Sequence, residues 1–392
     1  MKLDGLKVAI IGAGIGGLTA AVALSARGAA VTVLEQAEAI NEVGAGLQIS
    51  PNGVCVLDAL GLGDELRAIA VRAQGVELKD YRAGRGVLSF DLAKLSPHSP
   101  YYFVHRADLI DLLARTARSV GVKIRLLQKV KRIETGAPAR LWTVNGAEMK
   151  ADLVIGADGL HSQLRSELNG AAAPFFTRQV AWRATIANTM GHPNVARVHM
   201  GPKCHLVSYP LRGGELINLV AVQERVAWAE ESWTHKDDPE NLRAAFSRFG
   251  GDVPAMLAAT TDVRLWGLFR HQVAPIWHRE NAALLGDAAH PSLPFMAQGA
   301  VMAIEDAWVL ADAVDNAETI PEGLAAYQRR RETRVRKIVA AAEGNAWKYH
   351  LSFPPLRAAA HLALRVGGHL VPNKMAAQYD WIYQHDVTHA PT

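Results

Sequence analysis

The segment KVAIIGAGIGGLTAAVALSARGAAVTVLE, residues 7–35, decides the fold. Its first part, residues 7–11, is a short apolar run rich in β-branched side chains, which predicts a buried parallel strand. The run stops at Gly12, Gly14 and Gly17, in the spacing G-x-G-x-x-G, and a helix is predicted to follow. This order of elements predicts a β-α-β unit that binds an adenine dinucleotide.

The phosphates and the ribose of such a ligand have separate predicted contacts. The three glycines permit a tight turn, close approach of the backbone to a pyrophosphate, and close packing of the helix on the strand. Free amides at the helix N-terminus and the helix dipole offset the phosphate charge. The helix is predicted to end near Gly28, and a strand over 30–34 leads to Glu35. The Glu35 carboxylate can accept both ribose hydroxyls and would repel a ribose phosphate.

The same region offers a competing interpretation, because residues 8–26 form an uncharged run about as long as a membrane span. Against a span, the run contains four glycines and its apolar pattern changes from strand-like to helix-like at Gly12. A second strand with an acidic end also follows directly. We therefore expect no membrane association.

Composition places few further limits on function. With 392 residues and 49% hydrophobic content, the chain can bury a large core, and its length predicts two closely connected domains. A net charge of +4 gives no general case for binding nucleic acid. Two distant cysteines, Cys55 and Cys204, match no zinc or disulfide pattern and suit a reducing cytoplasm. The densest basic run is predicted to be a solvated or partner-facing helix side; it comprises Arg329, Arg330, Arg331, Arg334, Arg336 and Lys337.

Later segments extend the pattern. Residues 101–106 predict a strand that ends at Arg106, beside the first unit, and residues 152–159 predict another buried strand that enters an acidic turn. Alternating runs between 177 and 271 predict an antiparallel sheet that forms a second lobe. A helix is predicted over about 298–314, because the prolines before it exclude an earlier start.

Three separated motifs carry a family resemblance: GAGIGG with Glu35, GADGLHSQLR at 156–165, and GDAAHPSLPFMAQGA at 286–300. The chain resembles the single-component FAD-dependent aromatic hydroxylases, in particular the salicylate hydroxylase-like branch, over essentially its whole length. The resemblance implies an α/β fold. A Rossmann-like FAD-binding domain of the glutathione-reductase type would carry an inserted antiparallel β-sheet substrate domain and C-terminal helices. The expected boundaries are 1–176 for the first part of the FAD domain, 177–275 for the substrate domain, and 276–392 for the return and the helices.

The resemblance also implies contacts to a tightly bound FAD. Asp158, with Gly159 and Arg165, would contribute to FAD and NAD(P)H contacts, and Asp287 would lie at the ribityl chain. The remaining expected FAD contacts are Gly12, Gly14, Gly17, Glu35, Gln48, Arg106, Val130, Gly299 and Ala300. Independently of the family, amides at the start of the 298–314 helix would stabilise the anionic reduced flavin. The sequence contains no second G-x-G-x-x-G, so NADH or NADPH is expected only as a transient co-substrate.

The implied chemistry is ring hydroxylation: NAD(P)H reduces FAD, dioxygen adds to give a flavin hydroperoxide, and an electron-rich ring attacks its terminal oxygen. A phenol ionises near pH 10, as tyrosine does, so a base at the substrate hydroxyl would activate the ring. We expect that base to be His205, because alternation in HLVSYPL places His205, Val207 and Tyr209 on one sheet face. The backbones of His205 and Tyr209 are about 13 Å apart, at roughly 3.3 Å per residue. Both side chains can therefore reach one ring only if they converge.

His205 and Tyr209 match the family's His and Tyr that act on the substrate hydroxyl. Gln298 matches a glutamine that can hydrogen-bond near the substrate, although it could equally end the loop and start the helix. His290 is expected to order its loop rather than transfer protons. The sequence does not choose among four possible anchors for a substrate carboxylate, which are Arg183, His199, Arg212 and Arg270.

The predicted function is therefore hydroxylation of a small aromatic or N-heteroaromatic compound in the cytoplasm by a monomer or homodimer, with dioxygen and NAD(P)H. Gln48 lies where some relatives that act on pyridine-type rings carry a histidine base, which weakens a match to those enzymes. Two alternatives stay open. One is a flavin-dependent reductase or oxidase on the same scaffold, and the other is a flavin-binding regulator that uses the basic helix.

Overall fold

The computed structural model describes residues 3–40, 46–95, 98–226 and 236–389. The first β-α-β unit has the predicted form: β1 (Lys7–Ile11), α1 (Ile15–Ser25) and β2 (Ala30–Leu34), with the two strands paired in parallel. The uncharged run at 8–26 is thus divided between a strand and a helix. Among the described residues, no helix is both long enough and apolar enough to cross a membrane.

A six-stranded sheet continues from this unit in the order β19-β20-β12-β1-β2-β8. Its pairs are parallel except for β19 with β20, as expected for a doubly wound dinucleotide-binding domain. The added strands are β8 (Lys123–Arg125), β12 (Leu153–Gly156), β19 (His278–Arg279) and β20 (Ala282–Leu284). Residues from both ends of the chain therefore build one domain.

Two small antiparallel sheets flank the central one. The first is β11-β10-β9, built from β9 (Val130–Glu134), β10 (Ala139–Thr143) and β11 (Glu148–Ala151). The second is β3-β7-β4, built from β3 (Gly46–Ile49), β4 (Val71–Arg72) and β7 (Tyr102–His105). The helices of this part are α2 (Pro51–Ala59), α3 (Gly63–Ile69), α4 (Leu92–Leu95), α5 (Arg106–Ser119) and α6 (Gln163–Asn169).

An eight-stranded sheet forms the second lobe, in the order β17-β18-β13-β16-β15-β14-β5-β6. It is wider than the segment 177–275 expected for the substrate domain, because β5 pairs in parallel with β14 and brings β6 with it. Its strands are β5 (Gly75–Asp80), β6 (Gly86–Asp91), β13 (Phe175–Ala187), β14 (Val195–Gly201), β15 (Cys204–Leu211), β16 (Leu216–Glu224), β17 (Lys236–Asp237) and β18 (Val263–Arg270). The sheet is antiparallel apart from that one pair, as the alternating runs predict.

One face of this sheet is buried by two short helices, α7 (Pro239–Ala245) and α8 (Val253–Ala258). Apolar side chains from the sheet and these helices form a separate core around Trp182 and Phe246. Because side chains alternate along a strand, this core leaves the opposite face of the sheet free to line a cavity.

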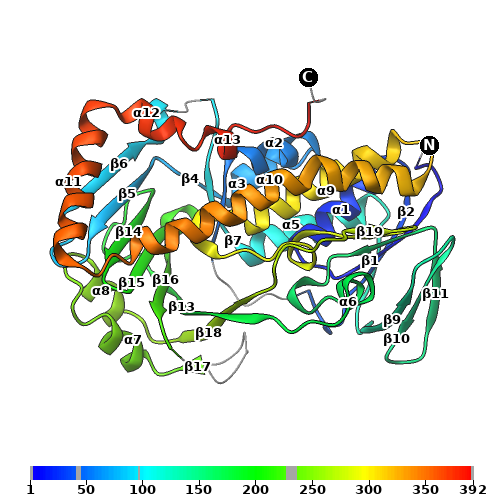
Figure 1. Cartoon of the computed structure of the whole chain (residues 1–392), viewed down its shortest axis with the longest axis horizontal. Coiled ribbons are helices and arrows are strands. Elements are labelled where there is room, and N and C mark those ends of the chain that lie inside the picture. Colours follow the sequence, from blue (N-terminus) through cyan, green and yellow to red (C-terminus); the bar gives the residue numbers. More distant parts are fainter. Residues whose placement is uncertain (1–2, 41–45, 96–97, 227–235, 390–392) are drawn as a thin grey trace.

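The C-terminal helices join the two lobes. α9 (Gly299–Asp315) packs on α1, and the long α10 (Ile320–Tyr349) then crosses the molecule diagonally toward the eight-stranded sheet. α11 (Pro354–Leu370) lies against β6 at the far end, as Figure 1 shows in orange-red, and is followed by α12 (Pro372–Ala377) and α13 (Asp380–Tyr383).

The basic run in α10 is divided between solvent and the interior. Arg329, Arg336 and Lys337 are exposed, as predicted for a solvated helix side, whereas Arg331 and Arg334 face α9. Arg331 is only 1% exposed, and its guanidinium lies 2.6 Å from Glu305 and 2.7 Å from Asp306, both on α9. Arg334 lies 2.7 Å from the same Glu305. Buried charges are stable only when they are paired, so these contacts fix α10 against α9. The prediction is wrong for Arg331 and Arg334, because their acidic partners lie on a different helix.

Candidate active site

A cavity of about 1360 Å³ runs between the two lobes. It is lined at one end by the glycine turn after β1 and at the other by the open face of the eight-stranded sheet. Side chains from α10 and α11 complete the wall beside the sheet. One continuous space thus connects the predicted dinucleotide site with the predicted substrate site.

The glycine turn has the geometry that its sequence predicts. Gly12 has a φ of +100°, and a Cβ there would lie 2.5 Å from the carbonyl oxygen of Ala157. A Cβ on Gly17 would lie 2.1 Å from the carbonyl oxygen of Gly12, so this glycine lets α1 pack on the strand. A Cβ on Gly14 would meet no atom within 4 Å, and this residue lines the cavity. The backbone at Gly14 is therefore open to a ligand.

The ribose end of the turn is built around Glu35. Its carboxylate oxygens accept hydrogen bonds from the amides of Ala13, at 2.8 Å, and Ala37, at 2.9 Å. These bonds hold the carboxylate at the cavity wall, where each oxygen keeps a further lone pair for a ribose hydroxyl. Val130 lines the same end of the cavity.

Acidic and basic groups meet in the middle of the cavity. Asp287 and Arg106 both line it, and each favours the charged form of the other. The Asp287 side chain is exposed to the cavity, but the surrounding protein partly desolvates its carboxylate and so raises its pKa. Burial of the Arg106 guanidinium lowers the pKa of that group. Gly299 and Ala300, the first residues of α9, face the same region. The helix N-terminus thereby points its free amides toward the cavity.

The open face of β15 has the predicted alternation. His205, Val207 and Tyr209 line the cavity, whereas Cys204 belongs to the core on the opposite face. The Tyr209 ring packs 5.0 Å from that of Phe103 on β7. Burial raises the pKa of Tyr209 and holds the pKa of His205 well below 6.5. Tyr209 is thus a protonated hydrogen-bonding group, and His205 is a neutral base, at neutral pH.

Comparison with known proteins assigns this arrangement to a family. A sequence model described as FAD binding domain matches residues 5–342. The chain belongs to the FAD-dependent aromatic hydroxylases. It is 34% identical over 359 residues to a 3-amino-4-hydroxybenzoate 2-monooxygenase of Streptomyces platensis, which covers 89% of this chain and 90% of the relative.

Two further matches describe the range of this family. A 3-hydroxybenzoate 6-hydroxylase of Polaromonas naphthalenivorans (strain CJ2) is 34% identical over 358 residues, covering 88% of each chain. The crystal structure of Klebsiella pneumoniae HpxO, complexed with FAD and uric acid, superposes with a TM-score of 0.83 at 27% identity. That match covers 93% of this chain and 95% of the other, so the hydroxylase shares both lobes with it.

In the present chain, the residues around the cavity fit FAD. Because Gly14 has no side chain, the space in front of its backbone stays open to a pyrophosphate. The buried Oδ1 of Asp158 accepts no hydrogen bond from the described residues. Asp158 is held by the amide of Gln163, 2.8 Å from its other oxygen, while burial raises its pKa. Gln48 also lines the cavity and accepts a hydrogen bond from the hydroxyl of Tyr101 at 2.9 Å.

Two expected contacts lie elsewhere. The Gln298 side chain, 1% exposed, donates to Ser50 at 2.9 Å and accepts from Asn52 at 3.1 Å, away from the cavity lining. Gln298 therefore starts α9, and the expectation that it hydrogen-bonds near the substrate is corrected. The Arg165 guanidinium donates to backbone carbonyls, including those of Ala288 and Ala289, and so supports the 286–290 loop from behind.

The structure also separates the four possible carboxylate anchors. Arg183 lines the cavity next to Tyr209. His199 faces Asp252, at 3.3 Å, and Arg212 pairs with Asp108 at 2.7 Å. Arg270 forms an ion pair with a glutamate of α10. Of the four, Arg183 is the guanidinium placed to meet a substrate.

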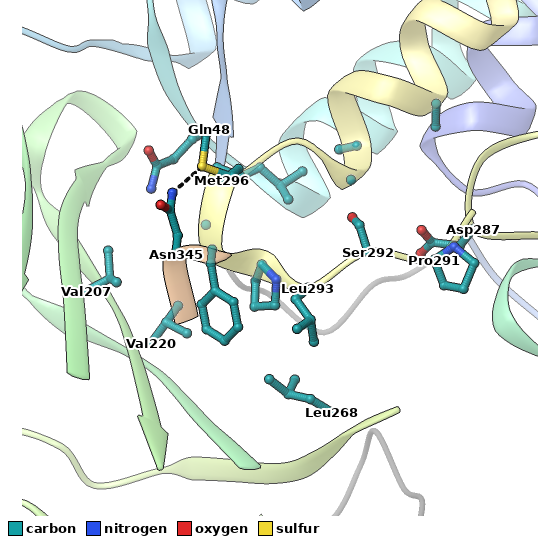
Figure 2. Close-up of a pocket in the computed structure, with 18 of the residues that line it drawn as sticks. Gln48, Val207, Val220, Leu268, Asp287, Pro291, Ser292, Leu293, Met296 and Asn345 are labelled. Carbon is teal, nitrogen blue, oxygen red and sulfur yellow. Dashed lines mark hydrogen bonds between the residues drawn. The ribbon is translucent and has the colours of Figure 1, made fainter. Parts of the chain in front are cut away.

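Several lining residues carried no signal in the sequence. Tyr349 and Asn345 from α10, and Tyr383 from α13, lie at the cavity although their helices showed only amphipathic patterns. Figure 2 shows Asn345 beside the 291–296 loop, where its amide contacts the sulfur of Met296. Their placement depends on α10 crossing to the second lobe, which periodicity does not predict.

Proposed function

We propose that the protein hydroxylates a small aromatic acid that already carries a ring hydroxyl, using NADH or NADPH and dioxygen. The observation that carries this proposal is that the dinucleotide cradle and the His205–Tyr209 strand face line one cavity. The relatives described above are named for 3-hydroxybenzoate and 3-amino-4-hydroxybenzoate, which are both hydroxylated aromatic acids.

The FAD-binding residues of this chain have distinct roles in the proposal. Bound FAD supplies the redox chemistry, namely acceptance of hydride from NAD(P)H and activation of dioxygen. The backbone at Gly14 accommodates the pyrophosphate, and Glu35 accepts the ribose hydroxyls. Asp287 binds the ribityl chain. The α9 amides at Gly299 and Ala300 stabilise negative charge on the pyrimidine end of the ring.

His205 is the proposed base for the substrate hydroxyl. Burial disfavours its charged form, which lowers its pKa and keeps the imidazole neutral at neutral pH. A neutral imidazole can accept the phenolic proton as the ring becomes nucleophilic. Tyr209, with its raised pKa, keeps its own proton and can hydrogen-bond to the same substrate oxygen or to a neighbouring substituent.

Arg183 is the proposed anchor of the substrate carboxylate. Its guanidinium stacks 4.2 Å from the ring centroid of Trp266, and its Nε is buried without a hydrogen-bond partner in the described part of the chain. Burial lowers its pKa to about 10, so the side chain stays charged at neutral pH. A carboxylate would satisfy this guanidinium through paired, charge-assisted hydrogen bonds.

The walls of the proposed substrate site are apolar. Figure 2 shows Val207 and Val220 from the sheet facing the loop that carries Leu293 and Met296, with Leu268 below them. Asp287 lies farther along the same loop, beside Pro291. Such walls suit a flat aromatic ring and exclude water from the reacting atoms.

The test is a screen of FAD-loaded protein against hydroxylated benzoates and hydroxylated N-heterocyclic acids. We expect a subset to stimulate NAD(P)H consumption and to gain one oxygen atom from isotopically labelled dioxygen, as measured by mass spectrometry. Stimulated consumption without a labelled product would instead support the reductase or oxidase alternative.

We also infer that the protein works in a reducing cytoplasm. Cys55 and Cys204 are free thiols, and burial raises the pKa of both, to about 11 for Cys204. Protonated, separated thiols suit a compartment in which disulfides do not form.

A further inference from the structure

His205 is the first member of a hydrogen-bonded chain that leaves the cavity. Its Nδ1 lies 2.7 Å from Nε2 of His350, the residue that caps the C-terminus of α10. Nδ1 of His350 in turn lies 2.9 Å from Oε1 of Glu224, at the end of β16. The two histidines are buried, whereas the Glu224 side chain is 40% exposed. The hydrogen-bonded chain therefore leads from the cavity at His205 to solvent at Glu224.

The carboxylate at the outer end fixes the direction of every hydrogen bond. An ionised Glu224 can only accept, so Nδ1 of His350 carries the proton of that bond. Nε2 of neutral His350 must then accept from Nδ1 of His205. The remaining nitrogen of His205, Nε2, is consequently unprotonated and is the one available to a ligand. Glu224 thus sets the tautomer in which His205 acts as a base.

Backbone contacts hold the chain in register. The amide of Lys203 donates to the carbonyl of His350 at 3.2 Å, and the amide of Glu224 donates to the carbonyl of Lys203 at 2.9 Å. The turn between β14 and β15 is thereby attached to the end of α10. These bonds hold the backbone of His350 and of Glu224 beside the start of β15.

The surroundings of His205 contain few other groups that titrate. The Phe295 and Tyr349 rings each lie 5.3 Å from its ring, and its strand partners are Met200 on β14 and Val222 on β16. The titratable neighbours among these contacts are Tyr349, whose pKa is raised by burial, and His350. Glu224 is the charged group bonded to the histidine pair.

We propose that His205, His350 and Glu224 form a proton relay that carries the substrate's phenolic proton from the cavity to the protein surface. This inference rests on the proposed function. The phenolic O–H bond breaks as a proton bonds to Nε2 of His205, and the Nδ1 proton of His205 moves to Nε2 of His350. The Nδ1 proton of His350 then moves to Glu224, which releases it to water. No electrons are gained or lost, and a proton returned along the same path restores the original tautomers.

In this relay His205 is the catalytic residue, and His350 and Glu224 act through it as positioning residues. Glu224 also stabilises a proton held on the histidine pair, because the carboxylate is bonded directly to His350 and lies farther from the phenolate. A bound phenol should therefore ionise at a pH below its usual range, first while its proton is on the histidine pair and then once the proton has left through Glu224.

The experiment follows the ionisation of a bound probe without turnover. Oxidised, FAD-loaded protein is titrated with 4-hydroxy-3-nitrobenzoate, whose phenol and phenolate forms differ in absorbance, and difference spectra are recorded against pH. We expect Glu224→Gln to raise the pH at which the bound probe ionises by about 1–2 units, since it removes one charge-assisted hydrogen bond. His350→Gln should cause a shift in the same direction.

The matched control is Glu148→Gln, because Glu148 on β11 is 43% exposed, much as Glu224 is, but lies in a different sheet. Its titration should follow that of the unmodified protein. Unchanged ionisation in Glu224→Gln and His350→Gln, with the probe bound, would overturn the relay and leave the proposed function intact. Failure of hydroxylated benzoates, this probe included, to bind the unmodified protein would instead overturn the proposed function, and the relay with it.

Discussion

Replacing Arg331 with methionine should destabilise the protein and loosen its hold on FAD. Glu305 and Asp306 are both fully buried, and Arg331 contacts each within 2.7 Å. Removing one partner of a buried ion pair costs about 3–5 kcal/mol because the remaining charge is left uncompensated. We expect the lower end of this range, since Glu305 keeps its contact with Arg334.

The expected loss can be expressed as a melting temperature. With about 2.1 cal/mol/K per residue, a chain of 392 residues has an unfolding entropy of about 0.8 kcal/mol/K. A loss of about 3 kcal/mol then lowers the Tm by about 4 °C. Thermal unfolding of the FAD-loaded protein, followed by flavin fluorescence, measures this shift.

The link to FAD passes through Asp306. One of its oxygens accepts from the amide of Gly286 at 3.1 Å and contacts His290 at 2.5 Å, so Asp306 orders the loop that carries Asp287. Loss of one such hydrogen bond, worth about 1 kcal/mol, would weaken FAD binding about fivefold. Flavin retained after ultrafiltration reports this effect.

Arg336→Met is the matched control. Arg336 lies on the same helix but is 47% exposed and pairs with Glu332 one turn away. Surface pairs of this kind contribute about 0–1 kcal/mol, so the control should melt within about 1 °C of the unmodified protein. If Arg331→Met had the same Tm as the control and retained its flavin equally well, the assignment of Arg331 as the residue that links α10 to the flavin loop would be refuted.

Three further outcomes are expected. Gly17→Ala should abolish or sharply reduce FAD uptake, measured by absorbance after reconstitution, because the added Cβ would lie 2.1 Å from a backbone oxygen. Arg183→Met should raise the KM for hydroxylated benzoates about 10–100-fold, by loss of a charged hydrogen bond worth about 1.5–3 kcal/mol, and should affect the parent phenols far less. Asp306 has a pKa lowered to about 2, so its stabilising contribution is complete above its unfolded pKa of about 3.9 and is lost as the pH falls toward 2. The difference in Tm between Asp306→Asn and the unmodified protein should therefore shrink over that interval; a constant difference would contradict the assignment.

The parts that the sequence predicts are those determined by local geometry. The glycine turn and Glu35 follow from spacing, since only one backbone conformation lets Gly12 and Gly17 approach their neighbours closely. The face shared by His205 and Tyr209 follows from strand alternation. The backbone oxygen that excludes a side chain at Gly17 belongs to Gly12, five positions earlier, and the strand face is set by alternation within a few residues.

The parts that the sequence misses depend on distant partners. Arg331 pairs with Asp306, which is 25 positions away in the sequence and on another helix. His205 hydrogen-bonds to His350, which is 145 positions away. The prediction for Gln298 is wrong for a related reason. A residue at the start of a helix can face either the ligand or the protein, and hydrogen bonds with Ser50 and Asn52 turn the Gln298 side chain toward the protein. Amphipathic periodicity shows that a helix has a buried face but does not identify what buries it.

The long helix α10 connects these distant contacts. Arg331, which orders the flavin loop through Asp306, and His350, which orients His205, are 19 positions apart on a helix that rises about 1.5 Å per residue, or about 28 Å in all. One rigid element thus sets the positions of both the flavin loop and the proposed base. Oxygen transfer to a ring requires the two to be aligned closely, and errors of about 1 Å are costly. A substitution that shifts α10 at its Arg331 end should therefore impair hydroxylation more than it impairs reduction of FAD by NAD(P)H, because only hydroxylation requires the substrate ring to be held between the flavin and His205.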